Sequence, residues 1–566
     1  MTSKPHWFMQ EVFLFRTIAS QLWAVLLVPA GVYGLLLTTQ VDLLHPWRWI
    51  VGCLFEALSP YNWGYLLLLW GVVVVAGTSH ARHLTVSPKI PQTRLARLVQ
   101  LLSPSSLMHA GMHVVMAMVM SYCAAALIGP QFSSLSLPCQ GSDQNMGGTV
   151  GPVHCLNEKS VFVVFSGAFL GLCYSVQYFL HSRHRLQFPV IQQAKFFRVR
   201  TLLPRLVVDS ASRVVRLLPG YYLGYYLLGH GVKTWMCALL RLKPSPVDIG
   251  SLHGLLDVGL LWQTAVGGTF MFCLLDTSWL MLHIFHAQVF KFEVASSLAD
   301  QTDRYLSDAV QCQDVPLVQY LGFLDLSLLA QFSPQRRRHI FSLSQPGGHP
   351  YVWKTVSTSS LAVLDSLTNR LAACRQNIGV TGQRLSPDPT RVQGSQKVGV
   401  GGGQAPGKLE KVTLGLRRTP VLAYFLQQLP EAASAELFQD AQLLVWVLEG
   451  LSHLVAASYT EDTYGVVQKS LPDILTALIG LHEALDRHFK MPLAGSRPSQ
   501  HAWLSCQRDV SSQNMRFSLL PAATTALYHI VNVFGKHVES IPLSTEHKQK
   551  LRLFLPQRDA AGIPRS

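Results

Sequence analysis

The chain has 566 residues, of which 49% are hydrophobic and only 14% are charged, against roughly 25% charged residues in soluble globular proteins. The net charge of +15 does not indicate a nucleic-acid-binding protein, because the basic residues gather in short segments between apolar runs, a pattern typical of membrane topology. The ten cysteines include no C-x-x-C pair, which excludes a zinc ribbon and a disulfide-rich scaffold.

Six apolar segments lie in residues 1–286, and each approaches the ~20 residues that an α-helix needs to cross the hydrocarbon core. They are Thr17–Thr38, Tyr61–Thr78, Leu107–Ile128, Ser160–Leu180, Val214–Val232 and Val258–His286. Pro219 and Gly220 interrupt the fifth segment, which is kept because without it the C-terminal half would lie across the membrane from the N-terminus. We therefore predict an all-α fold, a polytopic membrane protein with six transmembrane helices followed by a soluble α-helical cytoplasmic domain.

Lysine and arginine in the connecting loops set the orientation of such a protein. Most of those in residues 1–286 follow the second span, from Arg82 to Arg97, or the fourth span, from Arg183 to Arg216. These two loops are expected to be cytoplasmic, and with six spans both termini are cytoplasmic as well.

The second half of the chain divides by composition into three regions. Residues 287–375 are expected to form a membrane-proximal helical region, 376–408 a disordered Gly/Pro/Ser-rich linker and 409–566 an α-helical C-terminal domain. Within that domain the apolar spacing predicts helices at Ala432–Ser458, at Leu471–Phe489, at Leu519–Val538 and from Thr545. The segment Gly402–Lys408 fits G-x-x-x-x-G-K, but Leu409 follows where a phosphate loop needs Ser or Thr, so no nucleotide cofactor is predicted.

Three polar residues fall inside the predicted spans, where such residues are functional candidates. Asp276 lies in the sixth span, and His109 and His113 stand four residues apart in the third, a spacing that could hold a metal. An interhelical hydrogen bond is the simpler interpretation of the histidine pair, and we predict no metal, no cofactor and no catalytic residues.

Other residues are candidates for structural roles. Cys139 and Cys155 share the loop after the third span, which the charge pattern places in the oxidising lumen, so a disulfide is expected. Small residues four apart let helices approach closely, and basic residues in an amphipathic segment contact anionic lipid. The helix-packing candidates are Gly167, Gly171, Gly220 and Gly224, and the membrane-surface candidates are Arg198, Arg200, Arg205, Arg213 and Arg216.

The candidate contacts to a protein partner are Leu451, Leu454 and Tyr459. Apolar positions in this segment are bordered by Ser452 and Ser458, as at the rim of an interface.

Four long stretches resemble one known family, the transmembrane nucleoporins called nuclear division cycle protein one. They are Leu448–Leu475, Phe341–Pro350, Phe188–Arg200 and His109–Ala126. The resemblance implies a multi-pass protein of the nuclear pore membrane that anchors the nuclear pore complex in the nuclear envelope, supports pore assembly and is no enzyme. It implies soluble nucleoporins as partners, including Aladin and the RRM-containing membrane-binding nucleoporin, together with membrane lipids and without direct nucleic acid binding.

Two other classes of protein were weighed against this interpretation. A six-span transporter or channel should show several facing intramembrane charges, and Asp276 is the clear one here. A lipid-modifying membrane enzyme should show a polar catalytic cluster near the interface, and the sequence indicates none.

Overall fold

The computed structural model describes residues 7–87, 89–139, 154–244, 249, 257–294, 304–343, 348–383, 424–427, 432–490 and 510–555. The motif Gly402–Lys408 and most of the predicted linker lie outside the described residues. The chain forms two compact units. The N-terminal unit comprises His6–Thr85 and Val99–Gln288, and the C-terminal unit contains the described parts of Val86–Leu98 and Val289–Ser566.

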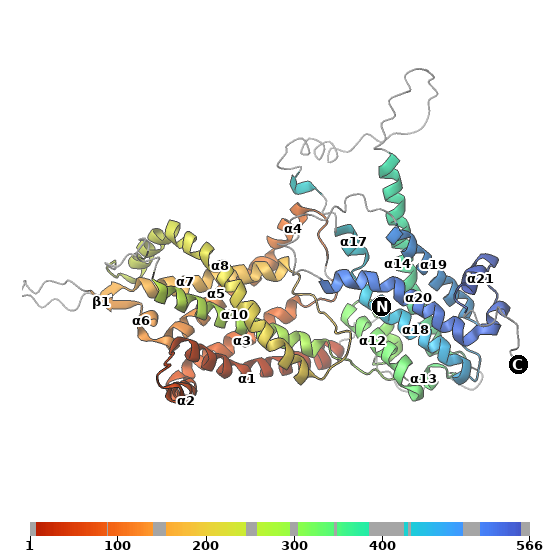
Figure 1. Cartoon of the computed structure of the whole chain (residues 1–566), viewed down its shortest axis with the longest axis horizontal. Helices are drawn as coiled ribbons and strands as arrows, with labels where there is room; N and C mark the ends of the chain where they lie inside the picture. The colour runs from red at the N-terminus through yellow and green to blue at the C-terminus, as the bar shows by residue number, and fades with distance from the viewer. Residues whose placement is uncertain are drawn as a thin grey trace, which may run out of the picture. The chain divides into compact units, whose positions relative to one another are not determined.

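The N-terminal unit is built from helices and one small hairpin (Figure 1). In chain order its elements are η1 (Phe8–Phe13), α1 (Leu14–Thr39), α2 (Pro46–Ala57), η2 (Pro60–Asn62), α3 (Trp63–His83), α5 (Pro104–Ile128), α6 (Pro130–Ser133), β1 (Ser136–Pro138), β2 (His154–Leu156), α7 (Glu158–Leu180), α8 (Lys195–Leu240) and α10 (Val258–His286). Helix α4 (Arg94–Leu101) links the two units along the chain.

The long helices α1, α3, α5, α7, α8 and α10 pack alongside one another (Figure 1). Their inward faces form one core of buried apolar side chains that includes Val28, Leu69 and Met120. The outward faces are also apolar, as Leu22, Trp23 and Leu26 of α1 show by their exposure of 60%, 56% and 66%. Helices that are apolar on all sides belong in a large protein core or in a bilayer.

Five of the six predicted spans coincide with five long apolar helices, and the fifth prediction, Val214–Val232, falls within α8. Among the described residues seven helices are long and apolar enough to cross a membrane. They are Phe8–Thr39, Pro60–His83, Pro104–Ile128, Glu158–Leu180, Val258–His286, Ser434–Glu461 and Arg516–Phe534.

Helix α8 joins two segments that the sequence separated. It runs without interruption for 46 residues through both Pro204 and Pro219, so it is about 69 Å long at 1.5 Å per residue. That is more than twice the ~30 Å hydrocarbon core. Only part of α8 therefore fits inside a bilayer, and the basic amphipathic segment forms its first half.

The C-terminal unit is likewise helical in its described part. Its elements are α11 (Leu306–Gln311), α12 (Pro316–Phe332), α13 (Pro334–Ile340), α14 (Tyr351–Gln383), α17 (Ala432–Leu437), α18 (Ala441–Glu461), α19 (Leu471–Lys490), α20 (Val510–Phe534), η4 (Gly535–Ser540) and α21 (Thr545–Arg552). Helix α18 lies at its centre against α12, α14 and α20, while α14 also packs on α19.

The boundaries in this unit differ from the predicted ones in three places, one of which is the helix predicted at Leu519–Val538, observed as α20 from Val510 to Phe534. The helix predicted at Ala432–Ser458 is split into α17 and α18, and α14 continues to Gln383, past the predicted start of the linker at Gln376. Helix α19 begins at Leu471 and α21 at Thr545, as the pattern predicts. Because α12 and α14 pack on α18 and α19, the membrane-proximal region and the C-terminal helices share one core.

Candidate functional site

A buried charge cluster is centred on Asp276 of α10, which is 1% exposed. Its Oδ1 lies 2.7 Å from Nη1 of Arg183, which follows α7, and its Oδ2 contacts the guanidinium of Arg213 on α8. Ser210, one turn earlier on α8, donates its hydroxyl to Oδ2 at 2.8 Å. Buried charges are stable only when paired and hydrogen-bonded, so this cluster fixes α8 and the end of α7 to α10.

A second ionic cluster lies at the opposite end of α7. Glu158 begins that helix and is 4% exposed, and its Oε2 lies 3.2 Å from Nζ of Lys233 on α8. The neighbouring Lys159 pairs with Asp257, at 2.7 Å, and Asp257 Oδ1 also accepts from the Leu260 N–H to cap α10. The hydrogen bond from Lys159 holds the pKa of Asp257 below its ordinary value.

The two clusters bracket the predicted fifth span. Arg213 and Lys233 are 20 residues apart on one continuous helix, a distance of about 30 Å along the axis. The hydrocarbon core has the same thickness. The stretch Val214–Val232 thus lies between two ion-paired ends, which is the placement that a transmembrane segment with charged flanks requires.

The five predicted membrane-surface arginines have different environments. Arg200, Arg205 and Arg216 are exposed on α8, whereas Arg198 and Arg213 are half-buried. Arg213 is a correction, because its guanidinium pairs with Asp276 inside the unit.

The glycine pair of α7 lies where two helices approach most closely. A Cβ added to Gly167 would stand 2.7 Å from the carbonyl oxygen of Ala117, and one added to Gly171 would stand 2.5 Å from that of His113. Both oxygens belong to α5, so any larger side chain would push α5 and α7 apart. The second predicted pair lacks such a contact, since a Cβ on Gly224 would meet nothing within 4 Å in the described part of the chain.

The loop after α5 carries a disulfide-closed hairpin. Strands β1 and β2 pair antiparallel, with Leu137 opposite Cys155. Cys139 and Cys155 are joined by a disulfide, with their Cα atoms 5.2 Å apart. Residues 140–153 between them lie outside the described part.

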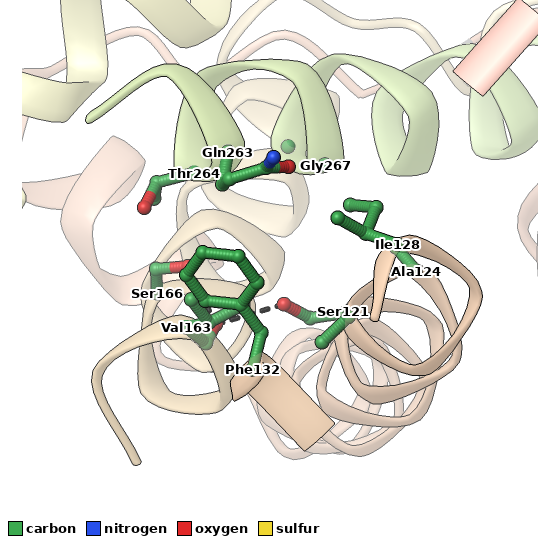
Figure 2. A pocket seen from close by; sticks show the side chains of 11 residues that line it. Ser121, Ala124, Ile128, Phe132, Val163, Ser166, Gln263, Thr264 and Gly267 are labelled. Carbon is green, nitrogen blue, oxygen red and sulfur yellow. Dashed lines mark hydrogen bonds between the residues drawn. The ribbon is translucent and has the colours of Figure 1, made fainter. Parts of the chain in front are cut away.

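Figure 2 shows a small cavity between α5, α7 and α10, lined by both apolar and polar side chains. Its volume is about 10 Å³, room for about one water molecule. The hydroxyls of Ser121 and Ser166 both donate to the Val163 carbonyl, at 2.8 and 2.6 Å, and Gln263 Oε1 has no hydrogen-bond partner among the described residues. A buried water bound to Gln263 fits this space, which is too small for an organic ligand.

Folding brings a third histidine to the pair on α5. His109 and His113 lie beside His80 near the end of α3, and all three side chains are fully buried. His80 was missed by sequence reasoning because it lies 29 positions before His109, and no local spacing connects the two.

Two of the three candidate partner-contact residues are not at the surface. Leu451 and Leu454 on α18 are fully buried in the core of the C-terminal unit, which corrects their assignment. Tyr459 is 53% exposed, with its ring edge against Phe534. Of these three residues, Tyr459 therefore has a surface that a partner could contact.

The C-terminal unit also contains an open groove that the sequence did not indicate. Its volume is about 510 Å³, within the range of ligand sites. Its polar lining includes Gln319, Thr358, Ser366, Arg370 and Asp440, from α12, α14 and the residue before α18. Arg370 donates to the carbonyl oxygens of Glu436 and Leu437 at the end of α17.

Long apolar helices with an apolar outer surface and buried ion pairs define a polytopic α-helical membrane protein. The family model described as "Nucleoporin protein Ndc1-Nup" matches residues 12–400 and 380–552. Relatives named Nucleoporin NDC1 include proteins from Xenopus laevis, 30% identical over 96% of this chain and 98% of the relative, and from Homo sapiens, 31% identical over 96% of each. A Drosophila melanogaster relative is 22% identical over 80% of this chain and 84% of its own.

The chain belongs to the Ndc1 nucleoporin family. It is a multi-pass nucleoporin of the nuclear pore membrane, as the resemblance implied. Its relatives are named as nucleoporins and not as enzymes, in agreement with the prediction of a non-enzyme.

Proposed function

We propose that this chain anchors the nuclear pore complex in the nuclear envelope, with the N-terminal unit held in the bilayer and the C-terminal unit recruiting soluble nucleoporins. The observation that carries the proposal is the difference between the two units in where they place apolar side chains. In the N-terminal unit α1, α3 and α8 expose large apolar residues along their outer faces, for example Leu67 on α3 and Leu228 on α8, at 62% and 71%. Such a surface is stable in lipid and not in water.

The C-terminal unit encloses helix α18, which is long and apolar enough to cross a membrane. Helix α18 buries Val447, Leu451 and Leu454, while its ends carry charged contacts. Arg337 Nη2 lies 2.6 Å from the Glu461 carboxylate, and Tyr320 donates to Asp440 just before the helix at 2.8 Å. A helix enclosed by protein and flanked by charges is the core of a water-soluble domain, so we assign this unit to the cytoplasmic or pore-facing side.

The recruiting surface is assigned to the groove lined by Thr358, Ser366 and Arg370 and to the region around Tyr459. The expected occupants are segments of soluble nucleoporins, among them Aladin and the RRM-containing membrane-binding nucleoporin. A concave site with an apolar floor and a polar, charged rim has the composition of a protein interface. Both termini face the cytoplasm in this arrangement, as the loop charges require.

The groove can be tested with two variants of the full chain. Ser366→Trp would fill it, whereas Asn369→Trp places the same side chain on an exposed part of α14 outside the groove lining. We expect Ser366→Trp to lower the retention of soluble nucleoporins at the nuclear rim by at least tenfold, and Asn369→Trp to retain them. Deletion of residues 289–566 should leave a membrane-inserted chain without these partners. Retention of the soluble partners by the deleted chain would refute this division of roles.

The transporter alternative gains no support from the charged residue that suggested it. Asp276 is paired with two arginines and a serine in a packed cluster, which is a structural arrangement and leaves no free carboxylate for an ion pathway.

A further inference from the structure

Three buried histidines of the N-terminal unit, His80, His109 and His113, lie close together. One ring nitrogen from each of His80, His109 and His113 lies within 4.8 Å of the others. The rings of His109 and His113 are stacked with centroids 3.9 Å apart, and the His80 ring lies 5.4 Å from that of His113. Tyr174 and Tyr178 of α7 enclose the cluster, each stacking on one or two of the imidazoles.

The cluster leaves many polar atoms unpaired. Both ring nitrogens of His80, the Nε2 atoms of His109 and His113, and the hydroxyls of Tyr174 and Tyr178 are buried without a hydrogen-bond partner among the described residues. A buried polar group without a hydrogen-bond partner has lost its hydration and gained no contact in return. Six in one place are a strong indication that a further atom belongs there.

Hydrogen bonds on the far side of two rings define which nitrogens are available. His113 Nδ1 lies 2.8 Å from the backbone carbonyl oxygen of His109, which only accepts, so Nδ1 carries the proton and Nε2 has the lone pair. His109 Nδ1 lies 2.7 Å from Ser175 Oγ, which can accept in the same way. A histidine that donates one N–H to a carbonyl or hydroxyl while its other nitrogen points inward has the geometry of a metal ligand.

We propose that His80, His109 and His113 bind one transition-metal ion of the zinc class within the N-terminal unit. A water molecule has two hydrogens to donate and so can satisfy at most two of three neighbouring imidazole lone pairs, whereas one cation can be shared by all three. Imidazole nitrogen is a preferred ligand of Zn²⁺, and a three-histidine site leaves its fourth position to water or hydroxide.

Two features of the geometry bear on the fit. Zn–N bonds of about 2.0–2.1 Å in a tetrahedron place ligand nitrogens about 3.4 Å apart, so rotation of the rings must close the present separation of up to 4.8 Å. The guanidinium of Arg183 lies 5.6 Å from the Tyr174 ring and pairs with Asp276. A bound metal would join α3 to α5, in addition to the charge clusters that link α7, α8 and α10.

The test uses the full chain, purified in lipid nanodiscs with an affinity tag free of histidine. The protein is stripped with a chelator, dialysed against Zn²⁺ alone and analysed for metal by mass spectrometry, and Co²⁺ loading is followed by its visible absorption. The variants are His80→Gln, His113→Gln and Ser175→Ala. The matched control is His83→Gln, which removes a half-buried histidine at the end of the same helix but outside the set of three.

Wild type and His83→Gln should bind one Zn²⁺ per chain with a tetrahedral Co²⁺ spectrum, and the thermal unfolding temperature should rise on loading. His80→Gln and His113→Gln should lose the stoichiometric metal. Ser175→Ala, which keeps all three ligands, should bind about 10–100-fold more weakly because it removes only the hydrogen bond behind His109. Wild-type protein that stays metal-free after dialysis, or equal metal contents in wild type and both histidine variants, would overturn the proposal.

Discussion

Neutralising Asp276 tests whether the charge cluster stabilises the N-terminal unit. In Asp276→Asn the guanidinium groups of Arg183 and Arg213, which are 17% and 18% exposed, lose their shared counter-charge. Breaking a buried ion pair by removing one partner costs about 3–5 kcal/mol. For a unit of this size, 1 kcal/mol corresponds to about 2–4 °C in the unfolding temperature, so we expect a decrease of about 6–20 °C.

The assay is thermal unfolding of the full chain in nanodiscs, and the control is Asp209→Asn, which changes an exposed aspartate on the same helix as Arg213. The triple variant Asp276→Leu, Arg183→Met, Arg213→Met should be more stable than Asp276→Asn, because it removes all three charges together. If Asp276→Asn unfolds within 2 °C of the Asp209→Asn control, the two arginines reach water without Asp276 and the reasoning fails.

Three further predictions concern packing and the disulfide. Gly171→Ala should lower the unfolding temperature because its Cβ would stand 2.5 Å from a backbone oxygen of α5, whereas Gly224→Ala should leave it unchanged or raise it; equal effects would refute the close contact. Non-reducing peptide mapping should recover Cys139 linked to Cys155, and opening this bridge should cost about 3 kcal/mol; free thiols at both positions in intact membranes would contradict it. Leu451→Glu should make the C-terminal unit sensitive to protease, because the substitution places a charge in the buried core. A protease-resistant variant would indicate that Leu451 lies at the surface, against this account.

The transmembrane helices were largely predictable because their signal is local. Each predicted span is a run of apolar residues near the required length, and five of them coincide with long apolar helices. The fifth was the weakest prediction because Pro219 and Gly220 interrupt the pattern. The segment has ion-paired ends because Arg213 pairs with Asp276 and Lys233 pairs with Glu158. These are tertiary contacts that no short window of sequence contains.

The buried site residues were less predictable, since they depend on which helices meet. Ser452 and Ser458 suggested an exposed rim, yet both are buried in the packing of α18. Their burial is tolerated because each hydroxyl donates to the backbone carbonyl three residues earlier, at 3.1 and 2.6 Å. At the break between α17 and α18, Asp440 accepts a hydrogen bond from Tyr320, a contact between distant residues that no local pattern contains. His80 joins His109 and His113 only when α3 packs on α5.

The central claim, a bilayer-anchored N-terminal unit with the C-terminal unit on the cytoplasmic side, is tested most directly by glycosylation mapping. One acceptor site is introduced into the disulfide-closed loop at residues 140–153 and another into residues 384–407, each in an otherwise unchanged chain expressed in cells. The account predicts glycan on the first site and none on the second, because an even number of spans, with Val214–Val232 of α8 among them, returns the chain to the cytoplasm. Glycan on the second site, or on neither, would contradict it.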